Sequence, residues 1–175
     1  ENIIMGMMIN ENENTYKDDL WVGDEISDKV LKSNIITKNN YSLSFWYKPD
    51  TNKPTSTILT LGDKDKSIVL SPSRFYNDNK EYHYDGINLN TYPNGDTVWK
   101  DKSATLKANR FNHIGISFNE GHATIYLNGE LVVSGNFNNK ISTGDIYIGH
   151  NPFDDSANDK VNGYYSDFKI FNGTL

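Results

Sequence analysis

The sequence predicts an all-β domain built as an antiparallel two-sheet sandwich, and three observations support this. The 175 residues include 24 Asn, 13 Gly and 11 Tyr. Tyr favours strands, whereas Asn and Gly favour turns. Apolar residues recur at every second position of many short segments, which is the period of a strand. Helical spacing is almost absent, and only residues 24–31 would fit a short helix or a turn.

The first strand signals lie between residues 41 and 70. Residues 41–47 place Tyr, Leu, Phe and Tyr at the odd positions and Ser, Ser and Trp46 at the even ones. Pro49 should end this strand because proline has no N–H to donate to a sheet. We expect the next strands at 57–61, closed by Gly62, and at 67–70, closed by Ser71-Pro72. Residues 74–101 follow as the least regular region, rich in Tyr, Asn and Asp.

The second half of the chain gives clearer signals. Residues 111–118 and 123–127 alternate on either side of a turn at 119–121. Asn128-Gly129 then predicts a type I′ hairpin leading to 131–134, because both central residues of that turn need positive φ. Residues 146–149 and 164–171 are the last strands. Nine or ten short antiparallel strands hide their edges in a sandwich or a barrel, and the one-sided apolar pattern favours the sandwich.

Length, charge and composition limit the function. We predict one domain over residues 20–175, with 1–19 as an N-terminal segment or first strand, and we expect a module of a larger protein. The net charge of −6 argues against nucleic acid or an anionic membrane surface as partner. The longest apolar run, 3–9, is far shorter than the roughly 20 residues of a membrane span. The absence of Cys excludes disulfides and a Cys nucleophile.

Three segments carry a resemblance to a known family. They are YSLSFWYKP at 41–49, RFNHIGISF at 110–118 with ATIYLNGEL at 123–131, and IYIG at 146–149 with GYYSDFKIFNGTL at 163–175. In this order they resemble the laminin-G-like branch of the concanavalin A-like lectin and glucanase superfamily, over residues 30–175. The resemblance implies a jelly-roll sandwich of two curved sheets. Ser166 departs from the acidic residue that the family often has, and Gly173-Thr174 replaces its basic-Ala pair.

Catalysis is not expected. A retaining glycosidase needs two carboxyl groups about 5 Å apart, which alternate positions of a strand can supply. The acidic residues on strong strand patterns, Glu130 and Asp167, each stand alone on their strand. His113 lies mid-strand opposite the Ile114 face, and the resemblance implies a structural histidine, because members without activity share it. We therefore predict no catalytic residue and no enzyme.

The predicted ligand is a glycan. Sugar recognition needs flat aromatic rings to stack on a pyranose face, with amides and carboxylates beside them to bind the hydroxyls. The irregular region supplies both, and we predict that the binding residues are Tyr82, Tyr84, Asp85, Asn88, Tyr92 and Trp99. The alternative is that half of the region's aromatics, which also include Phe75 and Tyr76, belong to the inner faces of two or three twisted strands. We interpret Trp46 as a core or packing residue.

Calcium is the one cofactor that the sequence raises. Asp154, Asp155 and Asp159 cluster in the loop before the last strand, and Asp63 with Asp65 flank a turn. Calcium prefers such clustered carboxylates, and the resemblance implies a structural calcium in many lectin domains. The competing interpretation, which we favour, is that these residues only make turns.

These observations lead to three hypotheses. The first is a non-catalytic carbohydrate-binding or adhesion module of an extracellular, cell-surface or phage tail protein, with a cell-surface glycan or polysaccharide and neighbouring domains as partners. The second is an architectural protein–protein interaction domain of a virion tail, baseplate or toxin. The third, glycoside hydrolysis, is disfavoured. A lectin should expose aromatic side chains in a groove, whereas an architectural domain should present a flat apolar patch.

Overall fold

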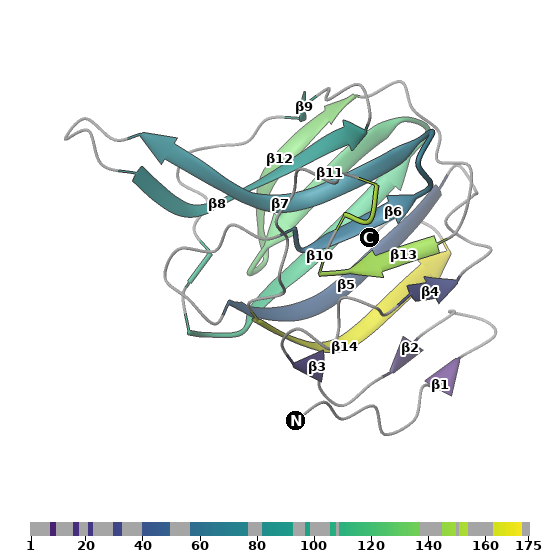
Figure 1. The fold of residues 1–175 in the computed structure, drawn as a ribbon, viewed down its shortest axis with the longest axis horizontal. Helices are drawn as coiled ribbons and strands as arrows, with labels where there is room; N and C mark the ends of the chain where they lie inside the picture. The colour runs from purple at the N-terminus through teal and green to yellow at the C-terminus, as the bar shows by residue number, and fades with distance from the viewer. Residues whose placement is uncertain are drawn as a thin grey trace.

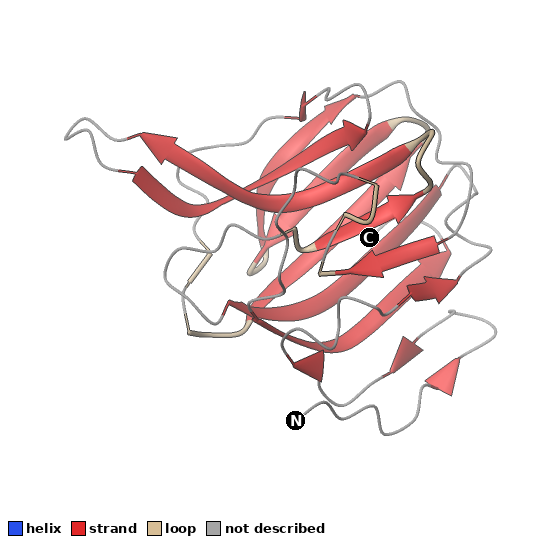
Figure 2. Ribbon diagram, viewed as in Figure 1, coloured by secondary structure: helices blue, strands red, loops and turns tan. Residues whose placement is uncertain are grey.

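The fold is known from a computed structural model, which describes residues 8–9, 16–17, 21–22, 30–32, 40–49, 57–76, 82–92, 97–98, 106–107, 109–136, 145–149, 151–153 and 163–172. These residues form strands and turns (Figure 2), as the all-β prediction required. In the same residues, no helix has the length and apolar character needed to cross a membrane.

One sheet has six strands in the order β12-β11-β10-β5-β14-β3 (Figure 1). Neighbouring strands in it run antiparallel, and β5 lies between β10 and β14. The strands are β3 (Trp21–Val22), β5 (Asn40–Pro49), β10 (Asn112–Asn119), β11 (His122–Leu127), β12 (Glu130–Asn136) and β14 (Gly163–Asn172).

The second sheet also has six antiparallel strands, in the order β4-β13-β6-β7-β8-β9. Its strands are β4 (Val30–Lys32), β6 (Leu59–Gly62), β7 (Ser67–Tyr76), β8 (Tyr82–Tyr92), β9 (Thr97–Val98) and β13 (Asp145–Ile148). A separate two-stranded ladder pairs β1 (Met8–Ile9) with β2 (Tyr16–Lys17). The two larger sheets lie over each other, and this confirms the predicted jelly-roll sandwich (Figure 1).

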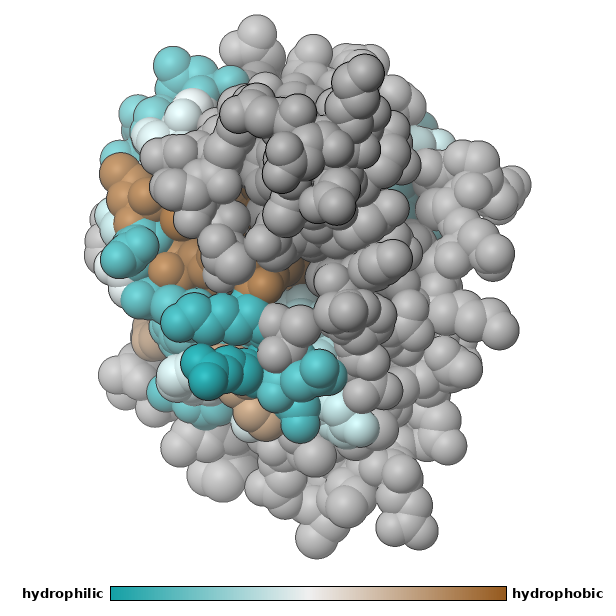
Figure 3. All heavy atoms as spheres, turned by 90° about the vertical axis from the view of Figure 1, so that its left-hand side faces the viewer, coloured by the Kyte–Doolittle hydropathy of each residue, from teal (hydrophilic) through white to brown (hydrophobic). Residues whose placement is uncertain are grey.

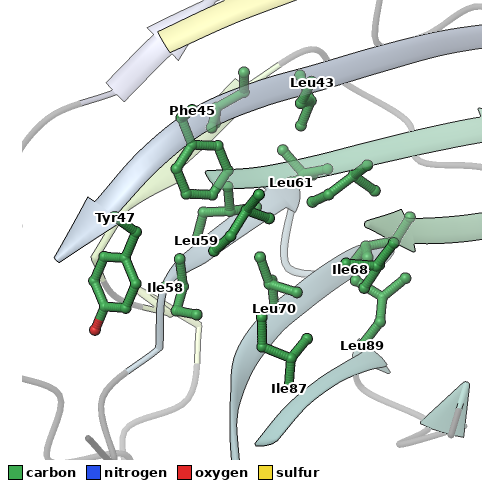
Figure 4. Close-up of a cluster of buried hydrophobic side chains, with 14 of the residues drawn as sticks. Leu43, Phe45, Tyr47, Ile58, Leu59, Leu61, Ile68, Leu70, Ile87 and Leu89 are labelled. Atoms are coloured by element: carbon green, nitrogen blue, oxygen red, sulfur yellow. The ribbon is translucent and has the colours of Figure 1, made fainter. Parts of the chain in front are cut away.

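The core lies between the two sheets. Figure 4 shows Leu43 and Phe45 of β5 facing Leu59 and Leu61 of β6. The Phe45 ring stacks on Phe168 of β14, with ring centroids 4.9 Å apart. Further buried apolar side chains come from both sheets and from Ile58, just before β6: Tyr41, Tyr47, Ile58, Ile68, Leu70, Ile87, Leu89, Ile114, Ile116, Phe118, Ala123, Ile125, Leu127, Ile146, Ile148, Tyr165 and Ile170. Burial of this apolar face is the main force that holds the sheets together.

The predicted hairpin turns are present. Asn128 and Gly129 have φ of 51° and 84°, both positive, as a type I′ turn requires. Glu120 and Gly121, with φ of 48° and 87°, connect β10 to β11 in the same way. Pro49 is the last residue of β5, which also agrees with the prediction.

The expected end of a strand at Ser71-Pro72 is wrong, because β7 continues through Pro72 to Tyr76. Strand β6 pairs with β7 only from Ser67 to Leu70, whereas β8 pairs with it from Ser67 to Tyr76. From Ser71 onward, β8 is therefore the one described neighbour of β7. A proline nitrogen is tolerated on the side of a strand that has no partner.

Two further expectations need correction. Residues 74–101, predicted to be the least regular region, contain the end of β7, all of β8 and β9. Pairing with β7 supplies the ladder that the Asn-rich sequence of β8 does not suggest by itself. For residues 24–31, the predicted helix or turn fails at its end, because Val30–Lys32 pairs with β13 as strand β4. Residues 24–29 lie outside the described ones.

Candidate functional site

The outer face of the second sheet carries part of the predicted site. Along β8, Ile87, Leu89 and Thr91 are buried against the core. Strand alternation therefore places Asn90 and Tyr92 on the opposite, outer face, where both are half-buried. Tyr147 of β13 lies on the same face, because its neighbours Ile146 and Ile148 are fully buried.

Three aromatic rings from distant segments meet on this face. The rings of Tyr92 and Phe153 stack with centroids 6.5 Å apart, and Phe153 packs edge-on to Tyr147 at 5.3 Å. The Tyr92 hydroxyl donates a hydrogen bond of 2.8 Å to the Phe153 carbonyl. The chain that leaves β13 thus turns back towards β8 (Figure 1). We call Asn90, Tyr92, Tyr147 and Phe153 the Tyr92 surface.

Strand β8 also holds most of the other predicted glycan-binding residues. Tyr82, Tyr84, Asp85 and Asn88 lie on it with Tyr92, and the backbone of Asn88 pairs with Ser71 of β7. Their side chains are outside the described part of the structure. Trp99 lies outside it altogether. One strand therefore carries five of the six predicted residues, spread along its length. Tyr92 is the one of the five whose side-chain contacts are described.

The carboxylates raised for calcium divide into two sets. Asp63 makes a turn: its Oδ1 accepts hydrogen bonds from the backbone N–H groups of Asp65 and Lys66, at 2.9 and 3.0 Å. Asp154, Asp155 and Asp159 lie outside the described residues, so calcium there stays a prediction. In the part of the chain that is described, no three His, Cys, Asp or Glu side chains group as metal ligands would.

A second aromatic surface was missed by the sequence interpretation. Trp46, expected in the core or in packing, lies on the outer face of the first sheet and is 40% exposed. Its indole packs edge-on to the His113 ring, with centroids 4.9 Å apart. The alternation that puts Leu43 and Phe45 inside puts Trp46 outside, and this signal could have identified it.

Lys48 extends this second surface along β5. Its Nζ lies 5.2 Å from the Tyr164 ring centroid and 5.9 Å from that of Phe111. Both distances are within the range of a cation–π interaction. Phe111 is 42% exposed, in the turn that precedes β10. We call Trp46, Lys48, Phe111, His113 and Tyr164 the Trp46 surface.

Charge near His113 acts on its imidazole. Burial lowers the His113 pKa from its ordinary value, Lys169 lowers it further, and Asp167 opposes both. Asp167 and Lys169 form an ion pair of 3.2 Å on β14. Asp167 has φ of 50° where the register of β14 shifts. The charged partner of Asp167 is therefore Lys169, whereas a retaining glycosidase would need a second carboxylate beside it.

Hydrogen bonds of two asparagine side chains position both His113 and the turn before it. The Asn128 Oδ1 accepts a bond of 2.8 Å from the His113 backbone N–H. Asn112 is fully buried; its Oδ1 accepts from the Lys107 N–H, and its Nδ2 donates to the carbonyls of Lys107 and Arg110. The turn from 107 to 111 is therefore fixed beside the end of β5.

Solved structures share this fold. Domain 4 of the arabinanase AbnA from Geobacillus stearothermophilus, solved in complex with arabinotriose, matches 100% of this chain and 78% of its own, with a TM-score of 0.59 and 17% identity. The receptor-binding domain of botulinum neurotoxin mosaic serotype C/D matches 100% of this chain and 42% of its own, with a TM-score of 0.53 and 19% identity. Galectin LEC-6 of Caenorhabditis elegans matches 86% of this chain and 94% of its own, with a TM-score of 0.54 and 12% identity.

No curated protein sequence matches the chain. A family model does, over residues 25–175, and it describes the concanavalin A-like lectin/glucanases superfamily. The match includes the three segments on which the resemblance was based. The chain therefore belongs to the concanavalin A-like lectin/glucanases superfamily.

Proposed function

We propose that this chain is a non-catalytic carbohydrate-binding module of an extracellular, cell-surface or virion protein. The observation that carries the proposal is the Tyr92 surface, where three partly accessible aromatic rings lie beside an amide on the outer face of a sheet. Aromatic rings bury the C–H face of a pyranose, and amide groups bond to its hydroxyls.

The geometry supports binding because the rings are already fixed. The hydrogen bond from Tyr92 to the Phe153 carbonyl holds the chain after β13 against β8. A preorganised surface loses less conformational entropy when a ligand binds. Tyr82, Tyr84, Asp85 and Asn88 continue the same strand and would extend the site.

The fold neighbours agree with this function. One was solved in complex with arabinotriose, and another is a galectin. A superfamily fold hosts many functions, so the surface residues and not the fold are the basis of the proposal.

Calcium would lie next to this surface if Asp154, Asp155 and Asp159 bind it. Asp154 directly follows Phe153 in the chain. We propose a structural role for the ion: it would fix the segment that supplies Phe153.

The experiment is a glycan array probed with the purified, multivalently presented module, with calcium and again with a chelator. Specific binding that is lost in Tyr84→Ala and Tyr147→Ala, and kept in Tyr126→Ala, is the expected result. Tyr126 is a matched control, since it is half-buried on the outer face of the other sheet. Circular dichroism checks that each variant is folded.

Each other outcome has a meaning. Binding lost on chelation alone would place the site at Asp154, Asp155 and Asp159. No binding by the folded, multivalent protein would contradict the proposal and favour an architectural domain in a tail, baseplate or toxin. Release of reducing sugar from a bound glycan over time would contradict the non-catalytic assignment.

A further inference from the structure

The Trp46 surface lies on the opposite side of the sandwich from the Tyr92 surface, and it differs in charge. Trp46 and Lys48 are alternate residues of β5 and therefore share one face, about 7 Å apart along the strand. Lys48 pairs with Tyr164, and Trp46 pairs with His113 on one side and Ser166 on the other. An exposed indole thus stands next to a cation in the middle of the sheet.

Cationic side chains lie at the end of β5 that follows this indole, although the whole chain has a net charge of −6. A hydrogen bond of 3.2 Å from the Asn109 N–H to the Pro49 carbonyl holds the neighbouring turn at the end of β5. Lys107 and Arg110 are exposed in this turn. Figure 3 shows the side of the molecule where β5 ends; strongly hydrophilic residues lie there beside hydrophobic ones.

Few acidic side chains lie on the strands of this sheet, and one of them already forms an ion pair. Strands β5, β10, β11, β12 and β14 contain two acidic residues, Glu130 and Asp167. Asp167 is paired with Lys169 at 3.2 Å. Among the described residues, Lys48 has no carboxylate within ion-pair distance, and two aromatic rings hold its ammonium group. An ammonium group held in this way can accept an anionic ligand without first breaking an ion pair.

We propose that the Trp46 surface is a second binding site, specific for an acidic saccharide. The indole of Trp46 stacks on the sugar ring, and Lys48 binds a carboxylate or sulfate group of the same or the next sugar, with Arg110 at the edge. Stacking gives the contact area, and the cations select anionic sugars over neutral ones. This site uses none of the residues of the Tyr92 surface and does not depend on that proposal.

The site is also rigid before it binds. His113 packs against the Trp46 indole, and Asn128 holds the His113 backbone. Asn112 fixes the turn that carries Arg110 and Phe111. The ligand therefore meets side chains that are already oriented, which lowers the entropy cost of binding.

The test is isothermal titration of the full chain with three hexasaccharides: hyaluronan, with carboxylates alone; heparin, with carboxylates and sulfates; and neutral maltohexaose. We expect binding of at least one acidic hexasaccharide and none of maltohexaose. Lys48→Gln should weaken it about tenfold, since a hydrogen bond to a charged group has that effect on affinity. Trp46→Ala should weaken it by a similar factor, because the stacking contact of the indole is lost. Tyr126→Ala, at a half-buried tyrosine on the outer face of the same sheet, should not change it.

Salt and spectroscopy give independent readouts. The affinity should fall as NaCl rises from 50 to 500 mM, because exposed charge pairs are screened. The indole N–H signal of Trp46 should shift in the NMR spectrum on titration, assigned by its loss in Trp46→Phe. Lys48→Gln serves if Trp46→Ala does not fold. Binding of the acidic sugars that both variants leave unchanged, binding of maltohexaose that both variants weaken to the same extent, or no binding of either acidic sugar would each overturn the proposal.

Discussion

Removal of the buried Asn112 amide should destabilise the protein more than any other exchange of a polar side chain on β10. Asn112 is fully buried, and its Oδ1 accepts from the Lys107 N–H at 2.9 Å and from the Asn128 Nδ2 at 3.2 Å. Its Nδ2 donates to the carbonyls of Lys107 and Arg110 at 3.0 Å, and to that of Tyr47 at 3.3 Å. One amide therefore connects β5, the 107–111 turn and the 128–129 turn.

The magnitude follows from the number of groups that lose their partner. Asn112→Ala removes the partner of one N–H and two well-placed carbonyls of the 107–111 turn. Each such hydrogen bond contributes about 1 kcal/mol net, so the loss should be about 3 kcal/mol. For a domain of this size, that corresponds to a decrease in Tm of roughly 6–12 °C.

Urea unfolding followed by circular dichroism measures the effect, with Asn119→Ala as matched control. Asn119 lies at the exposed end of the same strand, and its replacement should change the free energy of unfolding by less than about 0.5 kcal/mol. Asn112→Asp should be at least as unstable as Asn112→Ala at pH 7, because a carboxylate cannot donate to the carbonyls. A loss below about 1 kcal/mol in Asn112→Ala would refute this reasoning.

Three other predictions can be tested with the same purified chain. Burial raises the Tyr41 pKa above its ordinary value. The stability that the neutral phenol contributes is therefore present up to about pH 10 and is lost above it. In urea unfolding, the free energy of unfolding should decrease less between pH 8 and pH 11 in Tyr41→Phe than in the unchanged protein. Because the His113 pKa is lowered, the stability that its neutral imidazole contributes is present above about pH 6.5 and is lost as the pH falls. NMR titration should show a higher His113 pKa in Lys169→Gln and a lower one in Asp167→Asn. A methyl group at Gly129 meets open space at φ +84°, so Gly129→Ala should cost only backbone strain of about 1–2 kcal/mol in thermal unfolding; no loss would contradict this.

The local signals of this sequence predicted most of the strands. Residues 41–47 and 111–118 alternate clearly, and both form strands with the predicted face inside, except that Phe111 lies in the turn before β10. Asn128-Gly129 predicted its turn because few residues other than glycine and asparagine adopt positive φ at low cost. Strand β8 was the failure, since its sequence alternates only briefly and its ladder depends on a partner strand.

The candidate sites were less predictable. The aromatic and amide content of residues 82–99 pointed to β8, but nothing local indicated that Tyr92 would meet Phe153, 61 positions later. For Trp46, a core position was wrong, because the side chain lies on the accessible face of β5, whereas a packing role agrees with its contact to the His113 ring.

The sequence by itself determined the fold class, the family and the position of the hairpin turns. These depend on the period of apolar residues and on backbone preferences, both of which act between near neighbours. The tertiary structure decided that β7 continues beyond Pro72, and that aromatic side chains gather at the Tyr92 and Trp46 surfaces. Those outcomes depend on which strands become neighbours in the fold, because segments distant in the chain determine both the hydrogen bonding and the burial of each residue.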